Sequence, residues 1–166
     1  MIKTKRLNIY PASDEQMKCL IAEESIPELK AAYQEMLDGC MAHNGDRVWY
    51  ALWNVELNDK TGKVIGNLSF KGISEDGAVE IGYGISPEYE GQGYMTEAVS
   101  AAVRWASDQP RVHRIEAEAE SNNIASHRVL EKAGFVPTGE YGEEDTINLP
   151  ERKAKHSARL SLKNVH

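Results

Sequence analysis

The chain alternates between segments with the two-residue hydrophobic period of β-strands and segments with helical spacing. The clearest strand pattern is at residues 115–120, where three apolar residues alternate with three glutamates. Turn residues at 58–62 and 75–77 divide the middle of the chain into a predicted meander of three strands. The predicted strands are residues 6–11, 49–57, 64–70, 79–85, 115–120 and 158–162.

Capping residues and helical spacing predict four helices between these strands. Ser13 and Gln16 have the spacing of a capping box, so a helix should start there. Pro27 is placed to open the second helix and Gly39 to follow its end. Gly134 is placed to end the last helix in a left-handed conformation. The two later helices are predicted over residues 96–106, with a narrow face of alanine and valine, and over residues 125–133.

These elements follow one another without an internal repeat, a low-complexity segment or a linker-like stretch. The 166 residues are a usual length for one domain and are enough to bury a core without disulfides. We therefore expect a single domain over residues 1–166, of the α/β (α+β) class, with a mixed sheet flanked by helices.

Composition excludes several classes of protein. Hydrophobic residues make up 41% of the chain, which is too many for a wholly disordered protein. Cys19 and Cys40 are the two cysteines, and so few favour a reducing compartment over a disulfide scaffold. The sequence has no metal-type spacing, no secretory signal and no apolar run near the roughly 20 residues of a membrane span. We expect a cytoplasmic protein without a metal ion.

Charge is distributed unevenly. Residues 48–150 hold eight basic and 17 acidic residues, a net charge of −9, whereas residues 151–166 carry a net charge of +4. An acidic surface repels phosphate backbones, so nucleic acid is a poor partner and a cationic small molecule or basic peptide a better one. The basic tail is either an anion site or, as for most charge runs, a solvated last strand that balances acidic residues 140–145.

A glycine-rich segment from Glu90 to Thr96 lies between a predicted strand and a predicted helix. Gly91 and Gly93 permit backbone torsions that turn successive N–H groups into one concavity, and the helix start adds free donors. The segment suits a phosphate or pyrophosphate, although a plain turn into a helix would look the same. It lacks the Gly-Lys-Ser/Thr of a P-loop and the third glycine of a dinucleotide fingerprint.

A second motif covers residues 123–135. Asn123 is placed to cap a helix on which Ser126 and Leu130 lie near one another. By itself, this motif predicts no more than a capped surface helix.

Together, the two motifs, some thirty residues apart, make the chain resemble the GNAT N-acetyltransferase superfamily, in particular its branch of ribosomal-protein and small-molecule acetyltransferases. The resemblance covers most of the chain and is densest between residues 78 and 136. The matching segments are residues 5–7, 79–85, 91–98, 114–117 and 123–135.

The resemblance implies a twisted mixed sheet whose fourth and fifth strands splay apart around acetyl-CoA. Tyr83, Gly84 and Ile85 would then offer backbone groups to the pantetheine. Asn123 and Ser126 would face the pantetheine from the other side. The pyrophosphate would be held by Gly91, Gln92, Gly93, Tyr94, Met95 and Thr96.

Three positions depart from the family pattern. Glu90 replaces a usual glutamine or arginine, and a carboxylate beside a pyrophosphate is unfavourable unless it points to water. Met95 replaces a glycine or alanine. Leu130 stands where many members have a tyrosine general acid, so Ser126 or water would have to protonate the departing thiolate.

The general base is also assigned through the resemblance. Glu80 lies on the fourth strand, where some members keep a catalytic glutamate, although a solvent-facing or ion-paired glutamate is an equally natural interpretation. Glu116, Glu118 and Glu120 share the wet face of the next strand and are alternatives. A backbone N–H near Ile85 would stabilise the oxyanion. The five histidines show no partner pattern, and Trp49 and Trp53 fit a core or, less readily, an acceptor wall.

The sequence therefore predicts transfer of an acetyl group from acetyl-CoA to a primary amine of a small molecule or a peptide N-terminus, the acceptor being cationic. Two alternatives stay open. One is a GNAT-like module that binds CoA without turnover, and the other is an N-terminal acetyltransferase of ribosomal proteins. The acceptor's identity and the oligomeric state, a homodimer included, are not determined by the sequence.

Overall fold

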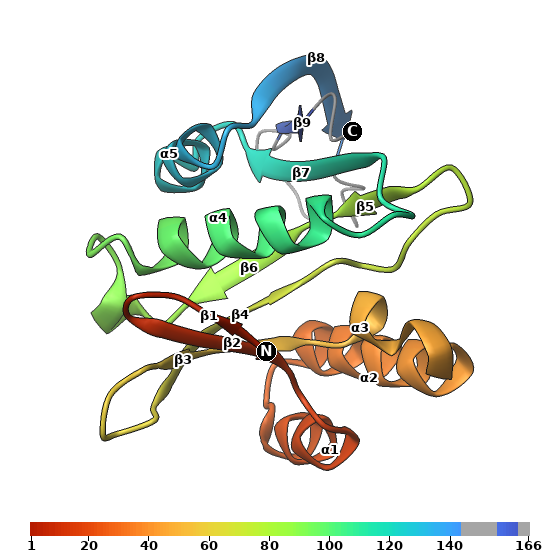
Figure 1. Cartoon of the computed structure of the whole chain (residues 1–166), viewed down its shortest axis with the longest axis vertical. Coiled ribbons are helices and arrows are strands. Elements are labelled where there is room, and N and C mark those ends of the chain that lie inside the picture. Colours follow the sequence, from red (N-terminus) through yellow and green to blue (C-terminus); the bar gives the residue numbers. More distant parts are fainter. Residues whose placement is uncertain (144–155, 163–166) are drawn as a thin grey trace, which may run out of the picture.

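The computed structural model describes residues 1–143 and 156–162, which form two sheets and flanking helices (Figure 1). The first sheet has the strand order β1-β2-β3-β4-β6 and the second β5-β7-β9-β8. The strands are β1 (Ile2–Lys3), β2 (Leu7–Pro11), β3 (Trp53–Leu57), β4 (Val64–Ser69), β5 (Ala78–Glu80), β6 (Gly82–Ile85), β7 (Arg114–Glu120), β8 (Val136–Glu143) and β9 (His156–Leu162).

The two sheets separate within a single stretch of chain. β5 pairs in parallel with β7, so that Glu80 lies opposite Glu116, and the Ile81 N–H still donates to the Glu116 carbonyl over 2.8 Å. From Gly82 onward the chain pairs instead with β4 in antiparallel register. The one strand predicted over residues 79–85 is therefore two strands, and the mixed sheet with splayed central strands is confirmed, with the splay between β6 and β7.

Helices flank the strands on both sides. Figure 1 shows α4 running along β6, with α1 and α2 on the far side of the first sheet and α5 beside one end of β7. The α-helices are α1 (Asp14–Glu23), α2 (Pro27–Ala42), α3 (Arg47–Tyr50), α4 (Tyr94–Ser107) and α5 (Ile124–Lys132), with short 3-10 turns at Asn44–Asp46 and Pro87–Tyr89.

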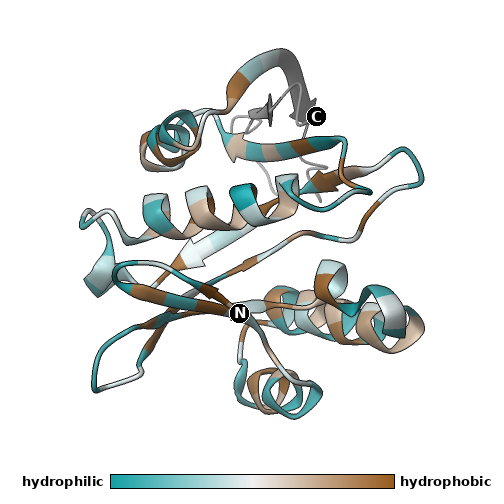
Figure 2. Ribbon diagram, in the orientation of Figure 1, coloured by the Kyte–Doolittle hydropathy of each residue, from teal (hydrophilic) through white to brown (hydrophobic). Residues whose placement is uncertain are grey.

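The core lies between α4 and the strands. Hydrophobic residues follow the strands, and the helices alternate between hydrophobic and hydrophilic positions (Figure 2). The predicted small-residue face of α4 is buried, and it packs against strand residues that include Ile65, Val79 and Ile81. Small side chains let this helix lie close to the sheet, which fixes the position of its N-terminal loop.

An aromatic cluster forms one end of this core and corrects a prediction. Trp49, Trp53, Phe70 and Trp105 pack with ring centroids 4.9–5.8 Å apart. Trp49 belongs to the short helix α3, so the strand predicted from residue 49 was wrong at its start. Packing of the Trp49 ring outweighs its strand propensity, and both Trp49 and Trp53 are buried core residues.

Some of the helix starts and ends predicted from capping residues are confirmed, and one is wrong. Ser13 caps α1 in the predicted capping box, and Gly134 has a φ of 96°. Gly39, in contrast, lies inside α2, which continues to Ala42. A Cβ on residue 39 would stand 2.9 Å from the Tyr50 ring, so this glycine permits close packing and does not end the helix. β1 and β8 were not predicted. The basic-tail residues 151–155 and 163–166, and residues 144–145 of the acidic segment, lie outside the described residues.

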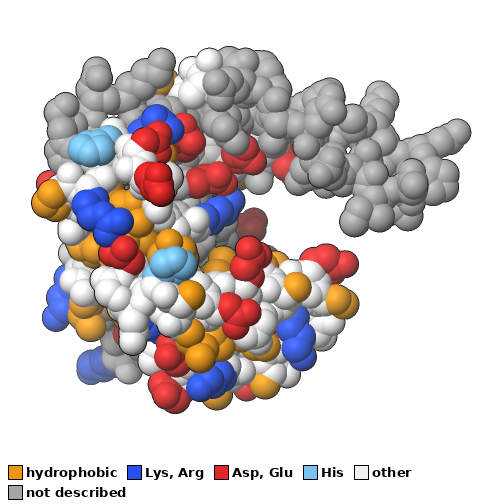
Figure 3. Space-filling model, turned by 90° about the vertical axis from the view of Figure 1, so that its right-hand side faces the viewer, with side chains coloured by type: hydrophobic (Ala, Val, Ile, Leu, Met, Phe, Trp, Pro, Cys, Tyr) orange, Lys and Arg blue, Asp and Glu red, His pale blue; other side chains and the backbone are white. Residues whose placement is uncertain are grey.

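Figure 3 turns the molecule so that the side with α2 and α3 faces the viewer. Charged side chains of both signs are scattered over the described part of this face, among hydrophobic and other side chains.

Candidate functional site

A cavity of about 840 Å³ opens between β6, the glycine-rich loop and α5. Ten of the eleven residues predicted to contact the cofactor line it, and Gln92 does not. The Gln92 side chain instead donates to the Glu88 carbonyl over 3.0 Å. The lining residues come from segments 83–96 and 123–132, so the two sequence motifs meet at one site.

The loop has the backbone conformation that an anion nest requires. Gly91 and Gly93 have φ values of 71° and 79°, in the left-handed region that favours glycine. Gly93 is the N-cap of α4, so the N–H groups of the first turn lack intrahelical partners. These donors and the helix dipole meet at the cavity, an arrangement that fits a phosphate or pyrophosphate group.

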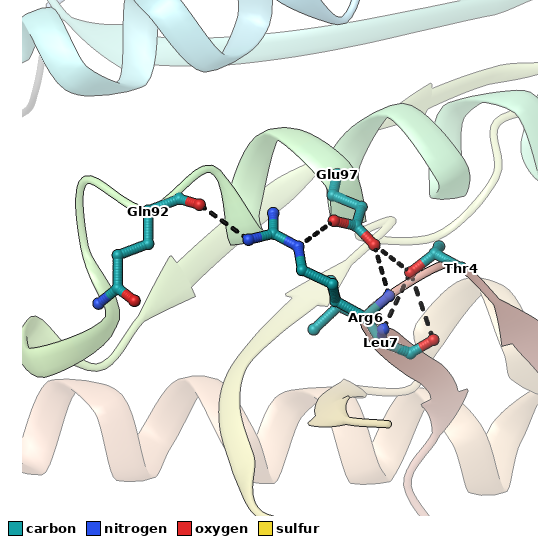
Figure 4. Close-up of polar contacts among 5 residues, drawn as sticks. All are labelled: Thr4, Arg6, Leu7, Gln92 and Glu97. Atoms are coloured by element: carbon teal, nitrogen blue, oxygen red, sulfur yellow. Dashed lines mark hydrogen bonds and ion pairs between the residues drawn. The ribbon is translucent and has the colours of Figure 1, made fainter. Parts of the chain in front are cut away.

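Arg6, near the start of the chain, binds this loop and the first turn of α4 (Figure 4). Its guanidinium donates to the Gln92 carbonyl over 3.0 Å and to the Glu97 carboxylate over 2.7 Å, and it lies 4.2 Å over the Tyr94 ring. Because carbonyl and N–H groups point opposite ways across a trans peptide, this bond directs the Gly93 N–H away from Arg6. The contact fixes the orientation of a peptide within the nest.

Glu97 completes this clamp by accepting hydrogen bonds from two residues. The Thr4 hydroxyl donates to it over 2.6 Å, and the Arg6 backbone N–H over 2.9 Å. Burial would raise the pKa of Glu97, but the hydrogen bonds from Thr4 and Arg6 outweigh it and lower the pKa below its ordinary value. Sequence analysis missed this residue, and the only signal for Arg6 was its place in the family's 5–7 segment.

Tyr83 and Ser126 meet across the splay at the other end of the cavity. The Tyr83 hydroxyl lies 2.7 Å from Ser126 Oγ, and it also donates to the Ser126 carbonyl over 3.2 Å. Asn123 caps α5 by accepting the Ser126 N–H over 3.0 Å, which holds the serine in place. Burial raises the pKa of the Tyr83 phenol, and the Ser126 hydrogen bond opposes it less strongly. Sequence analysis gave Tyr83 only a backbone role.

The three departures from the family pattern are resolved differently. Met95 is buried in the core, so only its backbone matters to the loop. Glu90 is exposed at the cavity's edge, where its carboxylate can remain in water. Leu130 is fully buried in the core and offers no proton donor.

A second cavity, of about 300 Å³, lies beside β5 and β7. Glu80 lines this cavity and not the larger one, and its carboxylate forms an ion pair with Lys71. Glu116, its register partner, accepts a hydrogen bond from Arg114 over 2.7 Å, and Arg114 also reaches Asp76 over 3.2 Å. Both carboxylates therefore already have cationic partners. Glu118 and Glu120 follow on β7, on the side predicted to be wet.

None of the histidines in the described part of the chain lines the larger cavity. His127 hydrogen-bonds the Glu120 carbonyl, and His43 stacks on Tyr50. Among residues 1–143 and 156–162, no cluster of three metal-ligating side chains was found. No helix in the described part of the chain has the length and apolar character needed to cross a bilayer.

Comparisons with known proteins agree on a family. A family model described as an acetyltransferase (GNAT) domain matches residues 7–136. The uncharacterized N-acetyltransferase YjdG of Bacillus subtilis is 35% identical over 75 residues, which cover 45% of this chain and 45% of that protein. The chain thus spans about half the length of the curated relatives it matches.

Solved structures resemble the whole fold. Spermidine N-acetyltransferase of Vibrio cholerae has a TM-score of 0.72 at 18% identity, covering 96% of this chain and 95% of that chain. RimL, a ribosomal L7/L12 alpha-N-protein acetyltransferase solved with coenzyme A, has a TM-score of 0.72 at 15% identity, with the same coverage. At these identities the likeness shows the fold.

Proposed function

Because the chain belongs to the GNAT acetyltransferase domain family, we propose that it transfers the acetyl group of acetyl-CoA to a primary amine of a small molecule or a peptide N-terminus. One observation carries this proposal. A single cavity has an anion nest at one end and, at the splay, the hydroxyl pair of Tyr83 and Ser126 at the other.

The residues fit acetyl-CoA along the length of this cavity. The N–H groups that follow Gly91 and Gly93 take the pyrophosphate, and the edge of β6 from Tyr83 to Ile85 takes the pantetheine. A strand edge that has lost its neighbour offers unpaired backbone groups to an amide-containing ligand. The thioester then lies near Tyr83 and Ser126, with a β6 backbone N–H near Ile85 as the donor to the oxyanion.

In the reaction, the acceptor nitrogen bonds to the acetyl carbon and the carbon–sulfur bond breaks. A cationic acceptor first gives up one proton to become the neutral amine, and its nitrogen gives up a second as the amide forms. The thiolate of CoA takes up one proton, and the other leaves to solvent. The Tyr83 phenol is a proton donor suited to this thiolate, directly or through Ser126, because its raised pKa keeps it protonated at neutral pH. Glu80, acting through water, is the proposed acceptor of the amine proton.

The acceptor is proposed to be cationic, in keeping with the net charge of −9 over residues 48–150. The similar structures are named for a polyamine and for a ribosomal protein terminus, so one panel should contain both kinds of amine. Turnover separates an enzyme from a module that binds CoA without catalysis. The cytoplasmic location, the homodimer and the exclusion of nucleic acid stay predictions.

The test of the cofactor site is Gly93→Val, with Gly45→Val as its matched control. A β-branched residue cannot adopt the left-handed conformation of Gly93 without strain, whereas Gly45 has open space where a Cβ would stand. We expect Gly93→Val to fold normally by circular dichroism and to lose CoA binding by calorimetry. A folded Gly93→Val protein with wild-type affinity would show that the pyrophosphate binds elsewhere.

A further inference from the structure

The second cavity lies on the same stretch of chain as the cofactor cavity, on the other side of the switch between sheets. Ala78, Val79 and Glu80 line it before the switch at Ile81, and Tyr83, Gly84 and Ile85 line the cofactor cavity after it. Between them stands Gly82, where the two sheets part. A ligand in the second cavity would therefore reach toward the splay, where the thioester is proposed to lie.

Lys71 fills the space next to this junction. Its Cε lies 3.2 Å, and its Nζ 3.8 Å, from the position that a Cβ would take on Gly82. From there its ammonium pairs with Glu80. The four-carbon side chain of Lys71 thus packs against the junction, and its primary ammonium group binds the Glu80 carboxylate.

The backbone of Lys71 is in an unusual conformation. Its φ of 49° is the only positive value recorded for a non-glycine among the described residues, and Gly72 follows with a φ of 89°. The Gly72 N–H donates to the Trp49 carbonyl over 2.7 Å, which fixes the turn. Glycine or asparagine would suit this conformation better than lysine does. A strained residue of this kind is a reason to look for a function of its side chain.

Of the two carboxylates that line the cavity, only Glu80 has a cationic partner that another cation can replace. Glu116 is held by Arg114, which also pairs with Asp76, so that its negative charge is matched by a structural cation. Glu80 is matched by Lys71, whose side chain is 49% exposed and can swing into solvent. If Lys71 withdraws, Glu80 requires another single positive charge, and the Tyr50 ring and Val79 offer an apolar wall to the chain that carries it.

We propose that this cavity binds the acceptor as a primary alkylammonium ion, and that the Lys71 side chain occupies the acceptor's place until the acceptor displaces it from Glu80. This inference rests on the proposed function and names its substrate class. Acceptors that carry a carboxylate on the same short chain as the amine are excluded, because that group would lie in a cavity lined by both Glu80 and Glu116. Lys71 is thus a specificity-determining residue and a competitor of the substrate.

The test compares Lys71→Met, which keeps the length of the chain and removes its charge, with Lys18→Met on the exposed side of α1. Butylamine, whose chain matches that of lysine, is the probe, and 4-aminobutanoate is its carboxylate-bearing counterpart. Two readouts are needed: KM and kcat at saturating acetyl-CoA, and calorimetric binding of butylammonium to the CoA complex.

Loss of the competing cation should lower the KM and Kd for butylamine in Lys71→Met by roughly two- to fivefold, the upper part of the range of a partly exposed ion pair. Lys18→Met should match wild type, CoA affinity should stay unchanged, and 4-aminobutanoate should remain a poor acceptor. Adding Glu80→Gln to Lys71→Met should remove the gain in binding.

Unchanged or weaker butylammonium binding in Lys71→Met would overturn the inference. So would a preference of wild type for 4-aminobutanoate that Lys71→Met abolishes, because Lys71 would then anchor a carboxylate. Tighter binding without turnover in any variant would support this cavity while contradicting the proposed transferase activity. Turnover of butylamine that Lys71→Met does not change would support the proposed transferase activity and contradict the assignment of this cavity to the acceptor.

Discussion

Tyr83 has a side-chain contact in addition to its backbone position on β6, because its phenol crosses the splay and reaches Ser126 on α5. A phenol and a serine hydroxyl 2.7 Å apart form a short relay toward the proposed position of the sulfur. Because the buried Leu130 cannot donate a proton, this pair is the proton source that we propose for the thiolate.

Tyr83→Phe should lower kcat by roughly ten- to a hundredfold, at or below the usual contribution of a positioned general acid, and leave the Kd for CoA nearly unchanged. Ser126→Ala should lower kcat by roughly ten- to a thousandfold if it relays the proton. The double variant should then be no slower than the slower single one. Additive losses in single-turnover experiments would mean that the two hydroxyls act separately.

The pH dependence of kcat follows from the same phenol. Burial raises its pKa above the ordinary 10.0, so the donor form persists through neutral and moderately alkaline pH and is lost only above that value. In wild type, kcat should therefore show no acid-side or neutral break from Tyr83. A fall in kcat between about pH 7 and 9 that Tyr83→Phe removes would contradict this assignment.

In the proposed reaction, Glu80 accepts the proton that the amine gives up. Turnover should rise with pH as the amine becomes neutral, and Glu80→Gln should depress kcat/KM most near neutrality, where deprotonation is hardest. Rate profiles on the best amine, measured from about pH 6 to 9, would show this. A Glu80→Gln profile that overlays wild type would leave Glu80 as a partner of Lys71 alone and move the base to Glu116, Glu118, Glu120 or solvent.

At the scale of elements, the parts that local chemistry determines could be predicted, and the parts that depend on distant contacts could not. The capping box at Ser13, the alternation in β7 and the glycine-rich loop are encoded within a few residues of sequence. The break at Ile81 is not, because it depends on which neighbour pairs with each half of residues 78–85. The same holds for α3, where Trp49 finds its partners in Phe70 and Trp105.

The clamp that Arg6, between β1 and β2, forms with the glycine-rich loop and α4 is such a distant contact, and it predicts a selective defect. Arg6→Ala should raise the KM for acetyl-CoA by roughly tenfold with little change in kcat, because the nest loses its fixed peptide. The KM for S-acetylpantetheine, which lacks the pyrophosphate, should not change. Arg104→Ala, on the exposed side of α4, is the control.

If Arg6→Ala raised the KM for acetyl-CoA and the KM for S-acetylpantetheine equally, Arg6 would stabilise the fold in general. Arg6→Lys should rescue the KM only in part, since lysine cannot bond the Gln92 carbonyl and the Glu97 carboxylate with one planar group.

For the whole molecule, the excess of acidic residues sets the direction of substrate attraction. The acidic middle of the chain, with a net charge of −9 over residues 48–150, produces a field that raises the local concentration of cations and lowers that of anions. The glycine-rich loop must therefore bind a polyanionic donor against this field, with main-chain donors, a dipole and Arg6 close by.

Salt should then weaken the binding of a cationic amine more than that of acetyl-CoA. Raising the ionic strength should increase the KM for a cationic amine, most for a polyamine, and should not weaken acetyl-CoA binding to the same degree. Steady-state assays at low and physiological salt would measure this. A KM for amines that is independent of salt would place the acceptor outside the acidic field.

The bond from Arg6 to Glu97 joins positions 91 residues apart, which ties the cofactor site to the order in which the chain is synthesised. A ribosome adds on the order of 5–20 residues per second, so Arg6 waits several seconds for its partner to emerge. Until then the loop lacks the contact that fixes the orientation of its Gln92–Gly93 peptide. Capture of CoA by a nascent chain would accordingly mark the moment at which the first strands have docked on α4.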